Sequence, residues 1–125
     1  MSVNLDHTIV SARSKEESAR FLAEILNLPE PVSWGHFEIV QVGELSIDFV
    51  DATEEIQSRH FAFKVSEQEF DEIFARIQAK ELQYWADPSK SRPNEINTRD
   101  GGRGFYFYDP SGHFLEVLTR SYVIS

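Results

Sequence analysis

The sequence predicts an α+β fold in which two βαβββ modules form a curved mixed sheet around a cleft. The order of strand and helix patterns in the first half of the chain recurs in the second half. Each half also contains a Ser-x-x-Glu capping box where its helix begins. We therefore expect a single domain, residues 1–125, with module one at about 1–54 and module two at about 55–125.

The first module opens with a strand pattern over residues 3–11, in which alternate side chains share one face. Ser14 is the expected N-cap of the helix that follows, with Glu17 at the third helical position. Beyond the helix, the alternation of apolar residues predicts a short strand and then two longer ones. Their expected positions are residues 32–34, 36–42 and 45–51.

The second module repeats this order. A strand pattern at residues 59–65 is followed by a helix with Ser66 as N-cap and Glu69 as its capping-box partner. A short strand is expected near residues 83–85, before a polar loop. The turn sequence Asp109-Pro-Ser-Gly112 then predicts a hairpin, with its strands at residues 105–108 and 114–119.

Composition and charge exclude several classes of partner. The formal net charge is −9, and phosphate binding needs clustered Lys and Arg, so we expect neither nucleic acid nor a membrane surface as a partner. No apolar run approaches the roughly 20 residues that span a bilayer, and the N-terminal residues lack the pattern of a signal peptide. We therefore expect a cytoplasmic protein. The sequence has no cysteine, so thiolate ligands are excluded.

Three of the predicted strands carry a polar side chain that suits metal binding: His7, His60 and Glu116. Two imidazoles and one carboxylate with open coordination positions form the facial triad typical of non-haem Fe(II). His7 and His60 occupy the same place in their modules, and Asp48 matches Glu116 on the last strand. One such residue alone is more often a solvated surface side chain. Four at equivalent positions favour a shared metal cleft.

Three longer stretches carry a resemblance to a known superfamily. They are Leu5-Asp-His-Thr-Ile, Arg59-His-Phe-Ala-Phe and Phe105-Tyr-Phe-Tyr-Asp-Pro-Ser-Gly-His-Phe-Leu-Glu116. Together they resemble the vicinal oxygen chelate superfamily, which includes glyoxalase I, fosfomycin-resistance transferases, bleomycin-binding proteins and extradiol dioxygenases. Two further stretches, Lys15-Glu-Glu-Ser-Ala-Arg-Phe and Arg99-Asp-Gly-Gly-Arg-Gly, resemble small single-domain dioxygenases similar to the ring-opening enzyme of chartreusin biosynthesis.

The resemblance implies roles for individual residues. His7, His60 and Glu116 are the implied metal ligands, and we expect a homodimer whose sites lie at the subunit interface. Tyr106 lies ten residues before Glu116, as in the extradiol dioxygenase signature, where the tyrosine hydrogen-bonds the substrate. An ordinary core tyrosine is the alternative. Asp48 is expected to act as an acid or base, or else as a fourth ligand as in glyoxalase I.

The chain departs from the extradiol signature just before its tyrosine. A histidine is expected there, and this chain has Asn97 and Arg99 in that region. The loop is an insertion relative to the first module, and its glycines permit unusual backbone angles or close approach to a ligand. We expect Asn97, Arg99 and Arg103 to bind the substrate as part of a lid, and Trp34 to contact it from the first module. A plain surface loop is the alternative.

These features predict a metal-dependent, dioxygenase-like enzyme that acts with O2 on an aromatic diol or a related polyketide-like ring. The expected cofactor is a divalent metal, with Fe(II) favoured over Ni, Zn or Mn. One alternative is a glyoxalase-like isomerase or lyase that uses Ni or Zn, with Asp48 as a fourth ligand. The other is a metal-free drug-binding resistance protein, which would bind a small molecule without turnover.

Overall fold

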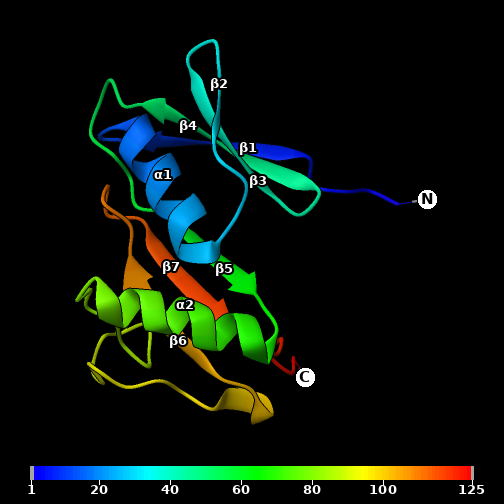
Figure 1. The fold of residues 1–125 in the computed structure, drawn as a ribbon, viewed down its shortest axis with the longest axis vertical. Helices are drawn as coiled ribbons and strands as arrows, with labels where there is room; N and C mark the ends of the chain where they lie inside the picture. Colours follow the sequence, from blue (N-terminus) through cyan, green and yellow to red (C-terminus); the bar gives the residue numbers. More distant parts are fainter. Residues whose placement is uncertain (1, 125) are drawn as a thin grey trace. The chain divides into compact units, whose positions relative to one another are not determined.

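The computed structural model describes residues 2–124, which form two compact units. The first unit extends to Ser58 and the second begins at Arg59. Each unit combines one α-helix with its own β-sheet (Figure 1). Within residues 2–124, neither helix has the length and the apolar character needed to cross a bilayer.

The first unit contains a four-stranded mixed sheet in the order β1-β4-β3-β2. Strands β1 and β4 run parallel, and the other neighbours are antiparallel. Strand β1 starts at His7, so the alternating pattern from residue 3 overstates its length. The elements are β1 (His7–Ala12), α1 (Lys15–Leu26), β2 (Val32–Trp34), β3 (Phe37–Val42) and β4 (Leu45–Asp51).

Helix α1 begins with part of the predicted capping box. The Ser14 hydroxyl accepts a hydrogen bond from Glu17 N at 3.2 Å, as predicted. The Glu17 carboxylate accepts from Arg13 Nη2 at 2.7 Å, which is one turn away along the chain. The helix ends where Asn27 adopts a left-handed conformation, φ 55°, and turns its N–H towards carbonyls of the last turn.

Alternation along β1 and β4 gives the first sheet two distinct faces. Val10 and Phe49 pair across these strands and are 2% and 4% exposed, on the face that α1 packs against. Ile9 and Asp48 pair on the opposite face, and His7 shares that face because it lies two residues before Ile9. The predicted site residues of β1 and β4 therefore lie on the side of the sheet that is turned away from α1.

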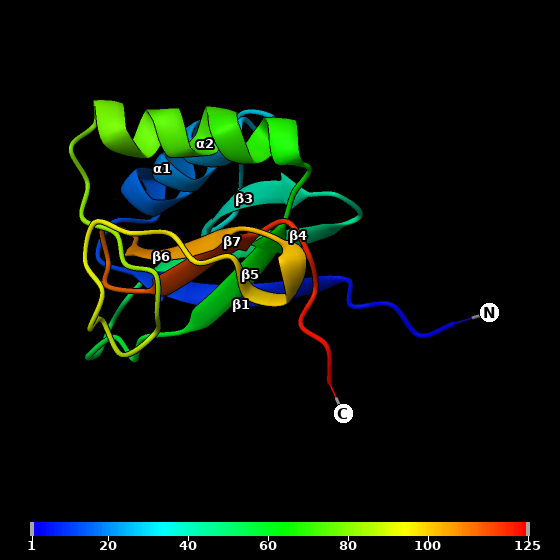
Figure 2. The ribbon, with the colours of Figure 1, turned by 90° about the horizontal axis from the view of Figure 1, so that it is seen from below.

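The second unit contains a three-stranded mixed sheet in the order β5-β7-β6. Strands β5 and β7 run parallel, and β6 and β7 form the predicted antiparallel hairpin. Figure 2 shows α2 lying across one face of these strands. The elements are β5 (His60–Lys64), α2 (Glu67–Ala79), the 3-10 helix η1 (Arg99–Gly101), β6 (Gly104–Tyr108) and β7 (Phe114–Leu118).

The prediction of a strand near residues 83–85 is wrong. Trp85 makes an isolated antiparallel bridge to Tyr106, with distances of 3.0 Å from Trp85 N to Tyr106 O and 2.8 Å from Tyr106 N to Trp85 O. Its other bridge partner is Pro93. Proline has no N–H, so it cannot extend a ladder of hydrogen bonds. The second unit therefore repeats the first without a regular equivalent of β2.

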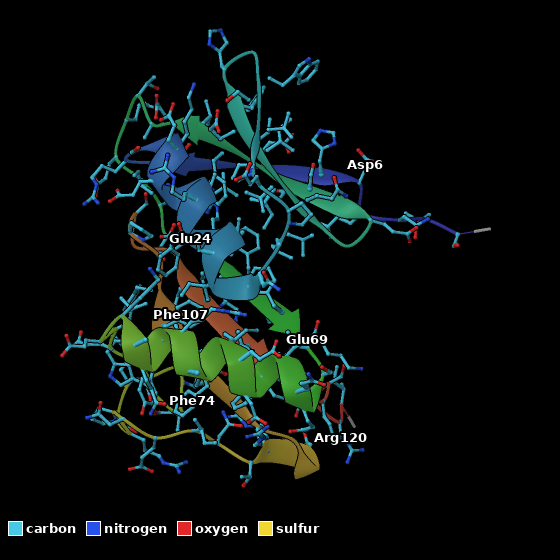
Figure 3. The ribbon with its side chains drawn as sticks, viewed as in Figure 1. Asp6, Glu24, Glu69, Phe74, Phe107 and Arg120 are labelled. Atoms are coloured by element: carbon cyan, nitrogen blue, oxygen red, sulfur yellow. The ribbon has the colours of Figure 1, made fainter. Side chains whose placement is uncertain are left out.

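Helix α2 begins with the complete capping box that the sequence predicts. Ser66 Oγ accepts from Glu69 N at 3.1 Å, and the Glu69 carboxylate accepts from Ser66 N at 2.9 Å. The second of these bonds is the main reason that the pKa of Glu69 is lowered. Figure 3 shows Glu69 in the first turn of the helix. Further along, Phe70 packs edge-on against Phe105 of β6, with ring centroids 5.4 Å apart.

A single carboxylate organises the loop that follows Trp85. Asp87 accepts hydrogen bonds from the hydroxyls of Ser89 and Ser91, at 2.7 and 2.5 Å. It also accepts from the backbone N–H groups of Ser91 and Arg92, at 3.0 and 2.9 Å. The bonds from Ser91 and then Ser89 hold the pKa of Asp87 well below its ordinary value. The ionised carboxylate therefore stabilises the loop.

Replacing Asp87 with Asn should destabilise the protein at neutral pH, because the amide has the same shape but lacks the charge that these donors stabilise. A lowered folded-state pKa contributes stability above the unfolded pKa of about 3.9. That contribution is lost as the pH falls through the folded-state value. The difference in unfolding free energy between wild type and Asp87→Asn should shrink below about pH 4. Urea unfolding of both proteins, from neutral pH to below about pH 4, measures this difference in free energy. A difference that persists unchanged at acid pH would contradict the lowered pKa of Asp87.

Candidate functional site

The second sheet places three of the predicted site residues on one face. In the register of the sheet, Glu116 pairs with Ala62 on one side and with Tyr106 on the other. His60 lies two residues before Ala62 and so points to the same side. Glu116, on the central strand, is only 2% exposed. A carboxylate is therefore buried between an imidazole-bearing strand and a phenol-bearing strand.

His60 is oriented by the backbone of β7. Its Nδ1 lies 2.9 Å from the carbonyl oxygen of Phe114, which can only accept a hydrogen bond, so Nδ1 carries the proton. The other ring nitrogen, Nε2, faces Glu116 Oε1 at 3.1 Å. When the imidazole is neutral, a lone pair of Nε2 faces a lone pair of Oε1. A cation between these two atoms, either a proton or a metal ion, stabilises the contact. Metal-binding histidines have their second nitrogen held in the same way.

The second carboxylate oxygen of Glu116 is held by a tyrosine. The hydroxyl of Tyr122 donates to Glu116 Oε2 and lies 3.1 Å from the hydroxyl of Tyr106. Arg99 lies beside them, with its guanidinium carbon 4.9 Å from the centre of the Tyr122 ring. We refer to these three residues, together with His60 and Glu116, as the Glu116 cluster.

Tyr106 is a neutral phenol in this cluster. It is 2% exposed, and this burial raises its pKa because the charged phenolate is disfavoured away from water. The negative charge of Glu116 adds to the effect, and Arg99 opposes it. Tyr106 therefore keeps its proton at neutral pH and can donate a hydrogen bond to an oxygen atom beside Glu116.

Tyr122 is the member of the cluster that the sequence did not predict. It lies beyond the last strand, where neither alternation nor helical spacing marks a face. The only signal is one aromatic residue in a polar segment, Thr119-Arg-Ser-Tyr122, a pattern equally typical of exposed chain ends. Its contact with Glu116 depends on how the chain turns after β7.

Aromatic rings extend from the cluster along the same face. Tyr106 and Phe114 stack with centroids 5.4 Å apart and an interplanar angle of 18°, and Tyr108 lies 4.8 Å from Phe114. Trp85 meets Tyr108 edge-on at 5.8 Å, and Lys90 Nζ donates to the Tyr108 hydroxyl at 2.7 Å. We call the four rings the aromatic wall. Its flat apolar surfaces and nearby cation suit a planar ligand with oxygen substituents.

The first unit contains a matching pair, His7 and Asp48. His7 pairs with the residue two before Asp48, and His60 pairs with the residue two before Glu116. Both pairs lie on parallel neighbouring strands, on the face opposite the helix. The equivalence predicted from the repeat is confirmed at the level of strand register.

His7 is also oriented by a hydrogen bond at Nδ1. This nitrogen lies 2.7 Å from Asp6 Oδ2, so Nε2 is the nitrogen left for a ligand, as in His60. The hydrogen bond to Asp6 is the main reason that the pKa of His7 is raised, and the charge of Asp48 adds to this effect. Asp6 is labelled in Figure 3. Asp48 is 8% exposed and accepts a hydrogen bond from Ser46 Oγ at 2.8 Å.

The remaining predicted site residues make other contacts. Arg103 donates to Glu67 Oε1 at 2.8 Å and pairs with a second carboxylate of α2, on the side of the sheet that the helix covers. Asn97 is 8% exposed, and its Oδ1 accepts from the backbone N–H of Arg99 at 3.2 Å. Asn97 thus positions the loop that carries Arg99. Trp34, in the first unit, is 70% exposed on the edge strand β2.

The donors in the Glu116 cluster fit a divalent metal ion. Among residues 2–124, no three His, Cys, Asp or Glu side chains gather into a metal-binding group. The members of the predicted triad that lie together in one unit are His60 and Glu116. An imidazole nitrogen and a carboxylate oxygen suit Fe(II), Mn(II), Ni(II) or Zn(II), so this pair supplies two donors of the right kind.

The chain is similar to several curated proteins, although no protein-family model matches it. It is 26% identical to the glutathione transferase FosA of Serratia marcescens over 128 residues, which cover 97% of this chain and 84% of that protein. It is 25% identical to the fosfomycin resistance protein FosX of Listeria monocytogenes over 126 residues, which cover 94% of this chain and 90% of that protein.

Two solved structures are more similar to this chain in sequence than these curated proteins are. The oxidase ChaP-H1 has a TM-score of 0.94 and 52% identity, over 96% of this chain and 98% of that one. The oxidase ChaP-H2 has a TM-score of 0.95 and 53% identity, over 98% and 97%. The chain therefore belongs to the vicinal oxygen chelate superfamily. Within it, the similarity to the ChaP oxidases confirms the resemblance to the chartreusin-type oxidase that the motifs indicate.

Proposed function

We propose that this protein is a metal-dependent, dioxygenase-like enzyme that acts with O2 on an aromatic diol or a related polyketide-like ring. The observation that carries the proposal is the pair of His60 and Glu116, in which a buried carboxylate faces an imidazole whose Nε2 carries no proton in the neutral ring. The names of the similar structures support oxidative chemistry, because both are oxidases. The curated relatives, a glutathione transferase and a fosfomycin resistance protein, support an enzyme of the same superfamily.

We propose Fe(II) as the metal, with His60, Glu116 and His7 as its ligands. His7 would come from the same chain or from the second subunit of a homodimer. Both histidines have Nδ1 held by an oxygen acceptor, which leaves Nε2 for a metal. Two imidazoles and one carboxylate leave coordination positions open. Fe(II) held by these residues would mediate electron transfer from the substrate to O2 and would polarise the oxygen atoms of the substrate.

Four further groups, the last of them from the first unit, have complementary roles in this proposal. The hydroxyl of Tyr106, which its raised pKa keeps protonated, donates a hydrogen bond to a substrate oxygen. Arg99 provides positive charge for an anionic phenolate oxygen. The aromatic wall stacks on the substrate ring and keeps water away from it. Asp48, held by Ser46, takes up or returns the proton of the second hydroxyl group.

Replacing His60 with Ala should abolish O2 consumption with an aromatic diol. It should also weaken Fe(II) binding by more than about 100-fold, because a direct ligand contributes more than the outer hydrogen-bond partners of ligands do. The matched control is His36→Ala, since His36 is exposed in the turn that precedes β3, and it should change neither quantity. An oxygen electrode and anaerobic calorimetric titration measure the two effects. Unchanged Fe(II) binding in His60→Ala would refute the ligand assignment.

Asp48 supports a second candidate function. It occupies the same strand register as Glu116, and this match favours a carboxylate that binds the metal directly. A site with four protein ligands leaves fewer open positions. It suits a glyoxalase-like isomerase or lyase in which Ni(II) or Zn(II) acts as a Lewis acid.

The Asp48→Asn variant separates the two functions. If Asp48 moves a proton, the variant should bind Fe(II) as wild type does and lose about 10²- to 10⁴-fold in turnover. If Asp48 is a ligand, its affinity for Ni(II) should fall together with its activity. Glu44→Gln, on the exposed turn between β3 and β4, is the matched control. Calorimetric titration with Fe(II) and with Ni(II) distinguishes the proton-transfer role from the ligand role. Full activity in Asp48→Asn would contradict both roles.

A further inference from the structure

The chain turns back after β7 and brings its C-terminal segment onto the Glu116 cluster. Strand β7 ends at Leu118, and the hydroxyl of Tyr122 then donates a hydrogen bond to Glu116 Oε2. Tyr122 is 36% exposed, whereas Glu116 is 2% exposed. A partly exposed phenol therefore reaches one oxygen of a buried carboxylate. Nothing in the proposed reaction accounts for this contact.

Two contacts hold the segment around Tyr122 in place. The backbone N–H of Val123 donates to Asp100 Oδ2 at 3.0 Å, and the guanidinium carbon of Arg99 lies 4.9 Å from the centre of the Tyr122 ring. Asp100 and Arg99 are adjacent residues of η1. One short helix therefore restrains both the backbone and the aromatic ring of this segment.

Gly102 lets the loop that carries η1 approach the C-terminal segment closely. A Cβ atom at Gly102 would lie 2.8 Å from Thr119 Oγ1 and 2.9 Å from Arg120 Cβ, which is shorter than van der Waals contact allows. Arg120, labelled in Figure 3, lies just beyond β7. The glycine at this position is therefore explained by close packing between the loop and the chain that leads to Tyr122.

Glu116 presents its two oxygens to different partners. Oε1 faces His60 Nε2 at 3.1 Å, and Oε2 accepts from Tyr122. A carboxylate that binds a metal through one oxygen can still rotate, and a donor at the other oxygen removes that freedom. Outer hydrogen bonds of this kind typically change metal affinity by about 10- to 100-fold.

We propose that Tyr122 is a positioning residue, which holds the Glu116 carboxylate so that Oε1 is presented to a metal ion. This inference rests on the proposed function, because only a metal-binding Glu116 needs a fixed orientation. The donor to Oε2 is Tyr122, whose hydroxyl lies 3.1 Å from that of Tyr106. In this role Tyr122 acts through Glu116.

The test is the Fe(II) affinity of the full-length wild type, Tyr122→Phe and Tyr84→Phe, measured by anaerobic calorimetric titration with Fe(II) alone. Tyr122→Phe keeps the ring beside Arg99 and removes the hydroxyl, which donates to Glu116 Oε2 and lies 3.1 Å from the hydroxyl of Tyr106. Tyr84→Phe makes the same chemical change away from the cluster, where Tyr84 meets Phe74 of α2 edge-on at 5.1 Å. We expect Tyr122→Phe to bind Fe(II) about 10- to 100-fold more weakly than wild type, and Tyr84→Phe to bind it equally well.

Asp100→Gly provides an independent variant that leaves the phenol of Tyr122 intact. It removes the acceptor for Val123 N, and glycine tolerates the left-handed backbone of Asp100, φ 53°. We expect weaker Fe(II) binding here too, with a smaller change. Wild-type affinity in both Tyr122→Phe and Asp100→Gly would overturn the positioning role and leave the proposed function standing. If the wild type itself binds no Fe(II), the proposed function fails and the inference fails with it.

Discussion

A carboxylate buried on the central strand of a three-stranded sheet is the constraint around which the second unit is built. Glu116 is 2% exposed in a chain with a formal net charge of −9. Burying such a group is costly unless it is paired and hydrogen-bonded. His60 faces one of its oxygens and Tyr122 the other, and Arg99 adds positive charge beside the tyrosines. Helix η1 contributes Arg99, and the chain after β7 contributes Tyr122, to the surroundings of this one side chain.

The two units place a histidine and a carboxylate at equivalent positions of their sheets. In each unit the first strand runs parallel to the last. The histidine of the first strand pairs with the residue two positions before the carboxylate of the last strand. A slip by one residue would turn these side chains towards the helix and the apolar residues away from it. Burial of the apolar face under α1 or α2 therefore also determines where the polar residues lie. The fold positions the chemistry of both units through the alternation of their strands.

Features that depend on local chemistry were predictable from the sequence, and features that depend on distant partners were not. The capping box of α2 and the shared face of His60 and Glu116 follow from periodicity and from the repeat. The strand expected near residues 83–85 was wrong because its pairing depends on residues that follow much later, one of them a proline. Tyr122 was missed because no periodicity encodes the turn after β7. Arg103 is engaged by carboxylates of α2, a pairing that the loop sequence does not reveal.

The most direct test of the central claim is X-ray absorption at the iron edge of the Fe(II)-loaded protein. The claim is that His60, Glu116 and His7 bind one metal ion. We predict the scattering pattern of two imidazoles and at least one carboxylate oxygen in the wild type, and of a single imidazole in His7→Ala. A wild-type spectrum with one imidazole, or a spectrum that His7→Ala leaves unchanged, would contradict it.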